Sequence, residues 1–257
     1  VQGTVQFPGN DLRIGPESPL LGRASGTLTF SDRGFAVANG QARLYGGDVR
    51  FDGGMAPDAR GITRIQFRGQ GTASAEGLRD ADLGFVSRLF ANASGSAAYS
   101  VQLGFRAGEP ELSVSSNLQG LAFALPAPLS KSAGDSLPLR LETRVLSTTS
   151  GLGGELPLTD RLQVAIGPVQ QPLLDLQYER DISGPEARVL RGSIGIGLGS
   201  TEAAPLPASG VVANVNTPLV DADAWERAFS DTTGVNVRGL AQPSTSPSLR
   251  YLPNRPA

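Results

Sequence analysis

The chain of 257 residues contains no cysteine and no histidine. These absences exclude Ser-His and Cys-His nucleophile pairs, zinc sites with His or Cys ligands, the usual haem and iron–sulfur ligation, and disulfide frameworks. Lysine occurs once, as Lys131, against 21 arginines. A lysine-dependent mechanism therefore has one candidate residue. We interpret the excess of arginine as the codon bias of a GC-rich bacterial genome.

Long apolar runs and a dominant charge are also missing. The longest apolar segment, residues 118–129, is interrupted by Gly120, Pro126 and Pro128, so no segment is expected to cross a bilayer as a helix. The net charge of −2 provides no electrostatic footprint for nucleic acid. The chain shows no signal peptide and begins without Met. We therefore expect a piece of a longer protein, with any anchor or export signal outside it.

Alternation of apolar with polar residues is abundant. Clear examples lie at residues 101–105, 137–145, 162–166 and 174–178. Because successive strand side chains point to opposite faces, this period of two predicts strands with one apolar face. Glycine-rich turn sequences separate the runs, for example at residues 32–34. The pattern predicts a mainly β fold, an extended antiparallel sheet or groove with an apolar inner face.

Only two segments favour a helix, residues 81–90 and residues 220–229 with Asp221 as N-cap. Residues 1–240 are expected to form a single elongated β-groove segment, and the proline-rich residues 241–257 a linker or unpaired tail. Two short helices are too few to cover the apolar faces of so many strands. A second sheet, a closed barrel, a solenoid or a bound ligand such as lipid would each cover them, and periodicity does not choose among these.

Three segments that resemble catalytic or binding motifs fail on their chemistry. Gly134-Asp135-Ser136-Leu137 spells the opening of a lipase motif, but the chain has no histidine to act as base, and a turn before a strand is expected. The segment starting at Asp221 has neither the glycine nor the glutamate of a calcium loop. Residues 192–199 alternate glycine with apolar residues and lack the lysine of a phosphate loop. They predict a strand whose Gly192, Gly195 and Gly197 leave one face bare. We expect no enzyme, no metal site and no cofactor.

Three further motifs occur in one order along the chain. Residues 118–134 follow the pattern L-x-G, an apolar run, then LP-x-PL-x-K-x-x-G, and PLR comes next at residues 138–140. RGSIGIG begins at Arg191 and is followed by PLP at residues 205–207. D-x-D-x-W begins at Asp221. In this order the motifs resemble those of YhdP-type proteins, members of the AsmA-like group that also includes TamB, over about residues 1–240.

The resemblance implies a long protein of the Gram-negative envelope. Such proteins are anchored in the inner membrane by an N-terminal helix, cross the periplasm as an extended β-groove, and carry phospholipid toward the outer membrane in outer-membrane biogenesis. The implied partners are phospholipids and, through parts outside this chain, the two membranes, with no nucleic acid. The motifs are structural landmarks, so no active site is carried over.

A continuous apolar floor can shelter acyl chains at about 0.8 kcal/mol per buried methylene. The residues expected to face acyl chains are the inward members of the alternating segments: Val101, Leu103, Phe105, Leu112, Val114, Leu121, Phe123, Leu125, Leu139, Leu141, Val145, Leu162, Val164, Ile166, Leu174, Leu176, Ile194, Ile196 and Leu198. Each of them is equally compatible with a protein core. A structural or adhesive β-module without ligand is the alternative function, although no repeat of fixed period indicates a solenoid.

Overall fold

The structure is a computed structural model that describes residues 2–13, 18–57, 63–81, 87, 90–106, 109–146, 157–184, 187–198, 205–216, 221, 223–224, 227 and 249–251. The chain divides into two units. Unit 1 comprises Val1–Phe123 and Ser132–Ser136, and unit 2 comprises Ala124–Lys131 and Leu137–Ala257. Whether residues 1–240 form one elongated segment stays a prediction.

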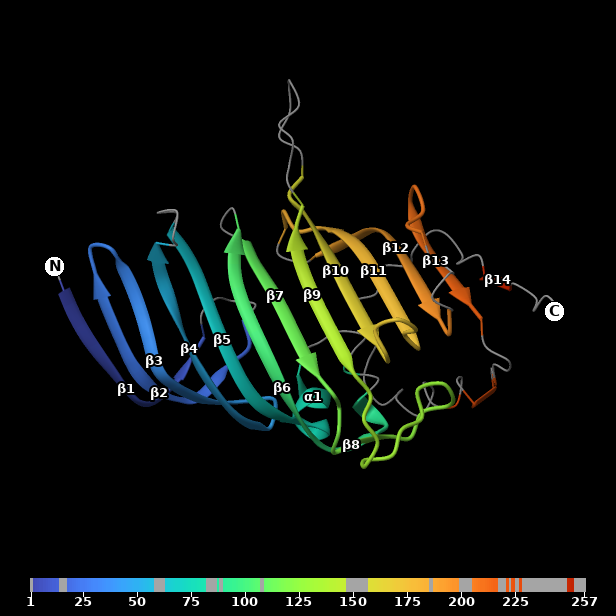
Figure 1. The fold of residues 1–257 in the computed structure, drawn as a ribbon, viewed down its shortest axis with the longest axis horizontal. Helices are drawn as coiled ribbons and strands as arrows, with labels where there is room; N and C mark the ends of the chain where they lie inside the picture. Colours follow the sequence, from blue (N-terminus) through green and yellow to red (C-terminus); the bar gives the residue numbers. More distant parts are fainter. Residues whose placement is uncertain are drawn as a thin grey trace, which may run out of the picture. The chain divides into compact units, whose positions relative to one another are not determined.

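Unit 1 is built from long strands that follow one another across an open antiparallel sheet (Figure 1). From β1 to β7, strands that are adjacent in the sheet also follow one another along the chain. The short β8 pairs with β6. The strands are β1 Gln2–Leu12, β2 Leu21–Ser31, β3 Gly34–Leu44, β4 Gly47–Pro57, β5 Thr63–Ser74, β6 Ala93–Arg106, β7 Glu109–Ser116 and β8 Leu121–Phe123. The predicted antiparallel sheet is confirmed here.

A two-residue turn connects β3 to β4 in unit 1. Tyr45 and Gly46 join β3 to β4 with φ values of 51° and 77°. Positive φ at both central residues is the geometry that matches the twist of the flanking strands. In β3 a bulge lies between Val37 and Gly40, where Asn39 has a φ of 54° and its N–H donates to Asp52 Oδ1 at 2.8 Å. The bulge keeps the apolar side chains before and after it on one face.

Unit 2 has shorter strands and mixed pairing. The strands are β9 Leu139–Val145, β10 Thr159–Ile166, β11 Leu174–Asp181, β12 Arg188–Ile196, β13 Gly210–Val215 and β14 Leu249–Tyr251. Strands β9 to β12 pair antiparallel, whereas β12 with β13 and β13 with β14 pair parallel. A parallel neighbour needs a connection that returns across the sheet. Alternation alone carries no information on such a connection, so the parallel pairs were not predicted.

Helix is scarce in the described part of the chain. Helix α1 spans Ala75–Asp80, and the Ser74 hydroxyl caps it by accepting from Gly77 N at 3.0 Å. The helix predicted over residues 81–90 lies mostly outside the described residues. For the helix predicted over residues 220–229, the described residues 223, 224 and 227 are helical. Asp221 Oδ1 accepts from Ala224 N at 2.9 Å, as expected of its N-cap.

The structure describes two further segments that the sequence singled out. The lipase-like segment forms a turn at residues 133–134, closed by Asp135 N donating to Ser132 O at 3.1 Å, shortly before β9 begins. Residues 249–251 of the expected tail form β14 and pair with β13. The other tail residues lie outside the described ones, so the boundary at residue 240 stays a prediction.

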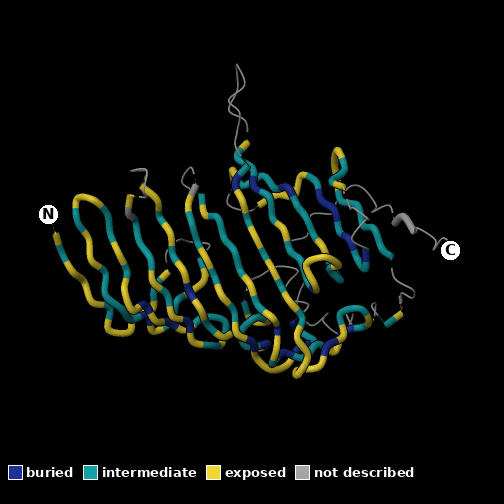
Figure 2. The backbone as a smooth tube through the Cα atoms, in the orientation of Figure 1, coloured by how far each residue is buried: buried dark blue, intermediate teal, exposed yellow. Residues whose placement is uncertain are grey.

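The buried core cluster of unit 1 is small. Ala24, Ala42 and Val49 form its buried core cluster, and a few half-buried side chains pack on it: Leu12, Leu21, Leu44, Phe51 and Tyr99. Figure 2 shows that most of the strands are coloured as intermediate or exposed, with little buried backbone. Most apolar strand side chains are therefore only partly covered.

Candidate functional site

The register of unit 1 gathers its apolar side chains on one face. Directly paired residues of neighbouring antiparallel strands point to the same side of a sheet. One row of such pairs crosses all seven long strands, and its members are Val5, Leu28, Val37, Gly53, Phe67, Leu103 and Leu112. A neighbouring row joins Phe51, Gly69, Val101 and Val114. We call the face that these rows share apolar face 1.

Unit 2 has a corresponding surface. Leu141 pairs with Val164, Val164 with Leu176, and Leu176 with Ile194. The next row is formed by Leu139, Ile166, Leu174 and Ile196. We call this surface apolar face 2. Ten of the sequence-predicted site residues lie in these four strands on this side: Leu139, Leu141, Val145, Leu162, Val164, Ile166, Leu174, Leu176, Ile194 and Ile196.

The predicted site residues fall into two groups by exposure. Most of those on the two apolar faces are half-buried, and Phe105 is exposed at 37%. In contrast Leu121, Leu125, Val145 and Leu198 are buried, with at most 7% exposed. Leu121 and Phe123 lie on β8 away from the main layer, and the Phe123 ring packs on Phe90 with centroids 5.6 Å apart. Burial favours the protein-core interpretation for the four buried residues and leaves the faces partly open.

Strands β1 to β5 contribute side chains to apolar face 1, but none of their residues was among the predicted site residues. Their alternating pairs at residues 28/30, 35/37, 49/51 and 65/67 are visible in the sequence. The missing signal is continuity, because glycines stand on the same face, for example Gly53 opposite Phe67 and Gly69 opposite Val101. The register shows that these glycines belong to the floor rather than to a break in it.

Aromatic rings cover several glycines of the two faces. A Cβ placed on Gly3 would collide with the ring of its paired residue Phe30, and one on Gly192 would collide with Tyr178. The same holds for Gly40 with Phe51 and for Gly53 with Phe67. Each ring occupies the space that a side chain would fill on the next strand. The floor is therefore flat where a run of branched side chains would make it ridged.

Gly192 corrects one prediction. The sequence placed Gly192, Gly195 and Gly197 together on a bare face of the strand. Register puts Gly192 opposite Tyr178 and on the same side as Ile194, so it belongs to apolar face 2, whereas Gly195 pairs with Asp175 on the polar side. The predicted strand was correct. Gly192 and Gly195 point to opposite faces because they lie an odd number of residues apart along it.

The Tyr99 hydroxyl is an unusual polar group on apolar face 1. Its oxygen is buried and has no hydrogen-bond partner among the described residues. A Cβ on its paired Gly71 would lie 3.1 Å from Tyr99 Cζ, so the ring lies over that glycine. Burial, helped by the nearby Tyr45, raises the pKa of Tyr99 from 10.0 to about 12. The hydroxyl therefore stays neutral at physiological pH.

Buried ion pairs stand at one end of unit 2. On the polar side, Glu179 accepts from Arg191 Nε at 2.6 Å and from Arg161 Nη2 at 2.7 Å. The hydrogen bond from Arg191, assisted by Arg161, lowers the pKa of Glu179 although burial opposes this. On apolar face 2, Asp160 accepts from Arg180 Nε at 2.9 Å and from Arg180 Nη2 at 2.5 Å. The polar groups at this end are thus fixed in place.

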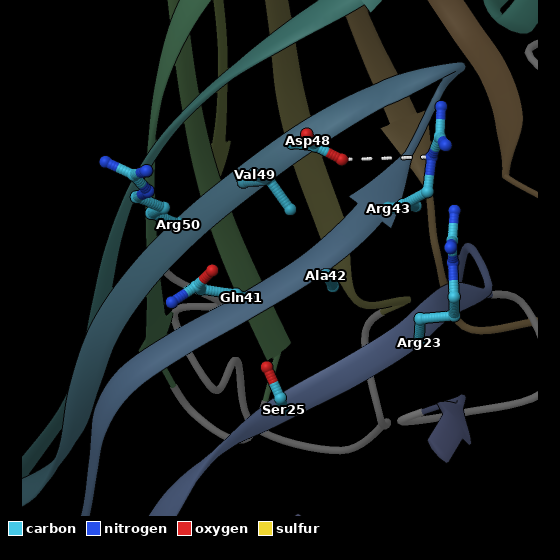
Figure 3. A pocket seen from close by; sticks show the side chains of 8 residues that line it. All are labelled: Arg23, Ser25, Gln41, Ala42, Arg43, Asp48, Val49 and Arg50. Carbon is cyan, nitrogen blue, oxygen red and sulfur yellow. Dashed lines mark ion pairs between the residues drawn. The ribbon is translucent and has the colours of Figure 1, made fainter. Parts of the chain in front are cut away.

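Strands β2 to β4 hold a hollow of about 450 Å³ (Figure 3). It is lined by Arg23, Ser25, Gln41, Ala42, Arg43, Asp48, Val49 and Arg50. Arg43 Nε and Asp48 Oδ1 lie 3.8 Å apart, and their side chains are 50% and 87% exposed. Exposed pairs of this kind contribute little, and the hollow has the character of a solvated charged surface.

No cluster of three or more Asp or Glu with metal-binding geometry occurs in the described part of the chain. No described helix is both long and apolar enough to span a membrane. The single lysine, Lys131, is buried with 7% exposed.

Fold and surface together define a class: a mostly antiparallel, open β-sheet protein with partly uncovered apolar faces. The family profile described as YhdP protein matches residues 1–254. The chain therefore belongs to the YhdP family, as its three ordered motifs predicted, and this family is related to lipid transport. No curated protein and no solved structure matches the chain.

Proposed function

We propose that this chain is a segment of an envelope-anchored protein of the periplasm that shelters phospholipid acyl chains and passes them toward the outer membrane. The observation that carries the proposal is the paired apolar row that crosses β1 to β7 while its members stay half-exposed. Apolar side chains in a packed core are normally buried. A row this long, left partly open, is suited to cover an apolar ligand that comes and goes.

The texture of the faces suits transfer better than tight storage. Each methylene sheltered from water contributes about 0.8 kcal/mol. Movement along a path needs binding that is similar at every step, because one deep site would trap the ligand. Rings lying over glycines and half-buried aliphatic rows provide a shallow, repetitive surface. Membership of the YhdP family supports the same function and supports an envelope location.

A matched pair of variants in one strand tests the proposal. Val164 lies on apolar face 2, and its chain neighbour Gln163 is exposed on the other side. We expect Val164→Glu to abolish crosslinking of the full chain to a phospholipid with a photoreactive acyl chain. Gln163→Glu should leave crosslinking unchanged, because the new charge stays in water. Circular dichroism checks that both variants are folded, and mass spectrometry identifies the lipids that co-purify.

Unit 1 allows the same comparison with Leu103→Glu and Gln102→Glu, which occupy opposite sides of β6. The proposal is abandoned if no lipid is found on the wild-type chain and the inward variants unfold. That result would favour a structural β-module whose faces are a protein core.

A further inference from the structure

The Asp160–Arg180 pair lies on apolar face 2, although the surrounding side chains are apolar. Register places Asp160 opposite Val145 on β9 and opposite Arg180 on β11. Two residues further along these strands, Leu162 pairs with Tyr178, and then the aliphatic rows begin. The pair therefore marks a polar limit of this face, at the ends of β10 and β11.

Arg180 presents a second edge for hydrogen bonding. A guanidinium has five N–H donors, and a carboxylate takes two of them from one edge. Asp160 occupies the edge formed by Nε and Nη2. The structure gives the other edge, formed by Nη1 and the second N–H of Nη2, no partner among the described residues. The Arg180 side chain is 21% exposed and that of Asp160 only 7%, so the free edge belongs to the more accessible member.

The charge around this end of unit 2 favours an added anion. On the polar side, Arg144, Arg161, Glu179 and Arg191 lie in one paired row across β9 to β12. Together with Asp160 and Arg180 these groups comprise four arginines and two carboxylates. An anion beside Arg180 would therefore be placed in a positive surrounding rather than a neutral one.

Stability alone is a weak reason for an ion pair at this position. Two buried charges lose their hydration, and apolar residues of similar volume often stabilise a protein equally well. Asp160 holds the guanidinium in one orientation, which leaves its free edge directed at a fixed place. This arrangement is suited to recognise a planar or tetrahedral oxyanion through two parallel hydrogen bonds.

We propose that Arg180, held by Asp160, binds the phosphate of a phospholipid whose acyl chains lie on apolar face 2. This inference rests on the proposed function and adds the position of the headgroup. From Asp160 to Ile166 the strand extends about 20 Å, at about 3.4 Å per residue. One leaflet's share of the hydrocarbon core is about 15 Å. An acyl chain that begins beside Arg180 therefore fits along β10, where it crosses the aliphatic rows between Asp160 and Ile166.

The test compares two lipids that share their acyl chains. The full chain is incubated with vesicles containing either phosphatidylglycerol or diacylglycerol, and the lipid bound per protein is measured by mass spectrometry. We expect the wild-type chain to prefer phosphatidylglycerol by about tenfold, as a charge-assisted bidentate contact would provide. The double variant Asp160→Asn/Arg180→Gln removes both charges and keeps both side chains polar, and we expect its preference to fall to near unity while its diacylglycerol binding is retained.

Arg188→Gln is the matched control, because it removes an arginine whose side chain is 74% exposed from the same end of the unit. It should keep the preference of the wild-type chain. An unchanged preference in the double variant would overturn the proposal and leave the pair a clamp on strand register. If the double variant does not fold, Arg180→Lys serves instead, since lysine keeps the charge but loses the second edge, and we expect a several-fold loss of preference.

Two further outcomes separate this inference from its alternatives. Binding of both lipids with equal affinity by the wild-type chain would sink the headgroup site but keep the proposed function. Absence of binding to either lipid would reject both. Titration with inorganic phosphate in the absence of lipid tests the other source of the same chemistry. Arg180-dependent binding of free phosphate that acyl chains do not strengthen would overturn the assignment to a lipid.

Discussion

The two units have similar apolar faces, but the ion pairs on their strands differ in how far they are buried. Strands β1 to β6 in unit 1 have 11 to 14 residues, and one ion pair of its polar side, Arg43 with Asp48, is exposed. Strands β9 to β12 in unit 2 have 7 to 9 residues, and two of their carboxylates, Asp160 and Glu179, are buried in ion pairs. A long strand fixes its register through many backbone hydrogen bonds. A short one has fewer, so directed ionic contacts at its end contribute more to register.

The faces also differ in composition. Aromatic side chains are frequent on apolar face 1, where Phe30, Phe51 and Phe67 cover glycines of neighbouring strands. Apolar face 2 is mainly aliphatic, with Tyr178 over Gly192 as the corresponding pair. Both solutions keep the floor low. Unit 1 achieves this with flat rings, and unit 2 with rows of Leu, Ile and Val of similar height.

The largest expected effect follows from removing the charge of Glu179. Glu179→Gln leaves Arg161 and Arg191 without their shared anion, and their side chains are 37% and 39% exposed, so water compensates in part. We expect a loss of about 2–3 kcal/mol in the free energy of unfolding of unit 2. Asp48→Asn in unit 1 should cost under about 0.5 kcal/mol because that pair is exposed. Hydrogen exchange of the strand amides assigns each loss to its unit.

The same carboxylate gives unit 2 a sensitivity to acid. The pKa of Glu179 in the folded chain lies below its ordinary value of 4.5. Its contribution to stability is therefore fully present above about pH 4.5 and is lost as the pH falls through the folded-state pKa. Glu179→Gln should flatten this acid dependence in β10 to β12. Equal acid dependence in wild-type and variant chains would contradict the role assigned to the pair.

The second expected effect concerns the flat floor. Gly192→Ala places a methyl group where the Tyr178 ring lies, so the ring must rise from the sheet. We expect a loss of about 1–3 kcal/mol from overpacking, together with weaker lipid crosslinking on apolar face 2. Gly104→Ala is the control in unit 1, because its Cβ would meet only Ile65 O at 3.8 Å. That variant should be neutral or slightly stabilising, and a similar loss at both positions would refute the explanation by ring contact.

Sequence reasoning succeeded where the controlling physics is local. Alternation with period two depends only on the direction of successive side chains, so it identified the strands and, for Leu103 or Val164, the face. The turn predicted at residues 32–34 does join β2 to β3, because local backbone preference decides such turns. The ordered motifs around Lys131, Arg191 and Asp221 identified the family.

Register and pairing were beyond the sequence because they are decided between segments. The bulge at Asn39 shifts the parity of β3, and a one-residue shift moves a side chain to the other face. Burial of Leu121 on β8 depends on a strand that pairs outside the main layer. The buried ion pairs of Glu179 join residues 12 and 18 positions apart, and with acidic residues spread along the polar faces no local signal singled it out.

The smallest expected effect tests the unpaired hydroxyl that distinguishes apolar face 1. Tyr99→Phe removes a buried oxygen that has no hydrogen-bond partner in the described part of the chain, so we expect a gain of about 0.5–1 kcal/mol in the stability of unit 1. Because the folded-state pKa of about 12 lies above the ordinary 10.0, the wild-type contribution is intact below pH 10 and is lost as the pH rises through 12. Tyr99→Phe should remove this alkaline loss of stability. Circular dichroism and amide exchange measure it from about pH 9, one unit below the ordinary pKa, to about pH 12, the folded-state pKa. Tyr178→Phe in unit 2 provides the comparison and should bring no gain, and a loss of stability in Tyr99→Phe at neutral pH would show that the hydroxyl has a stabilising partner.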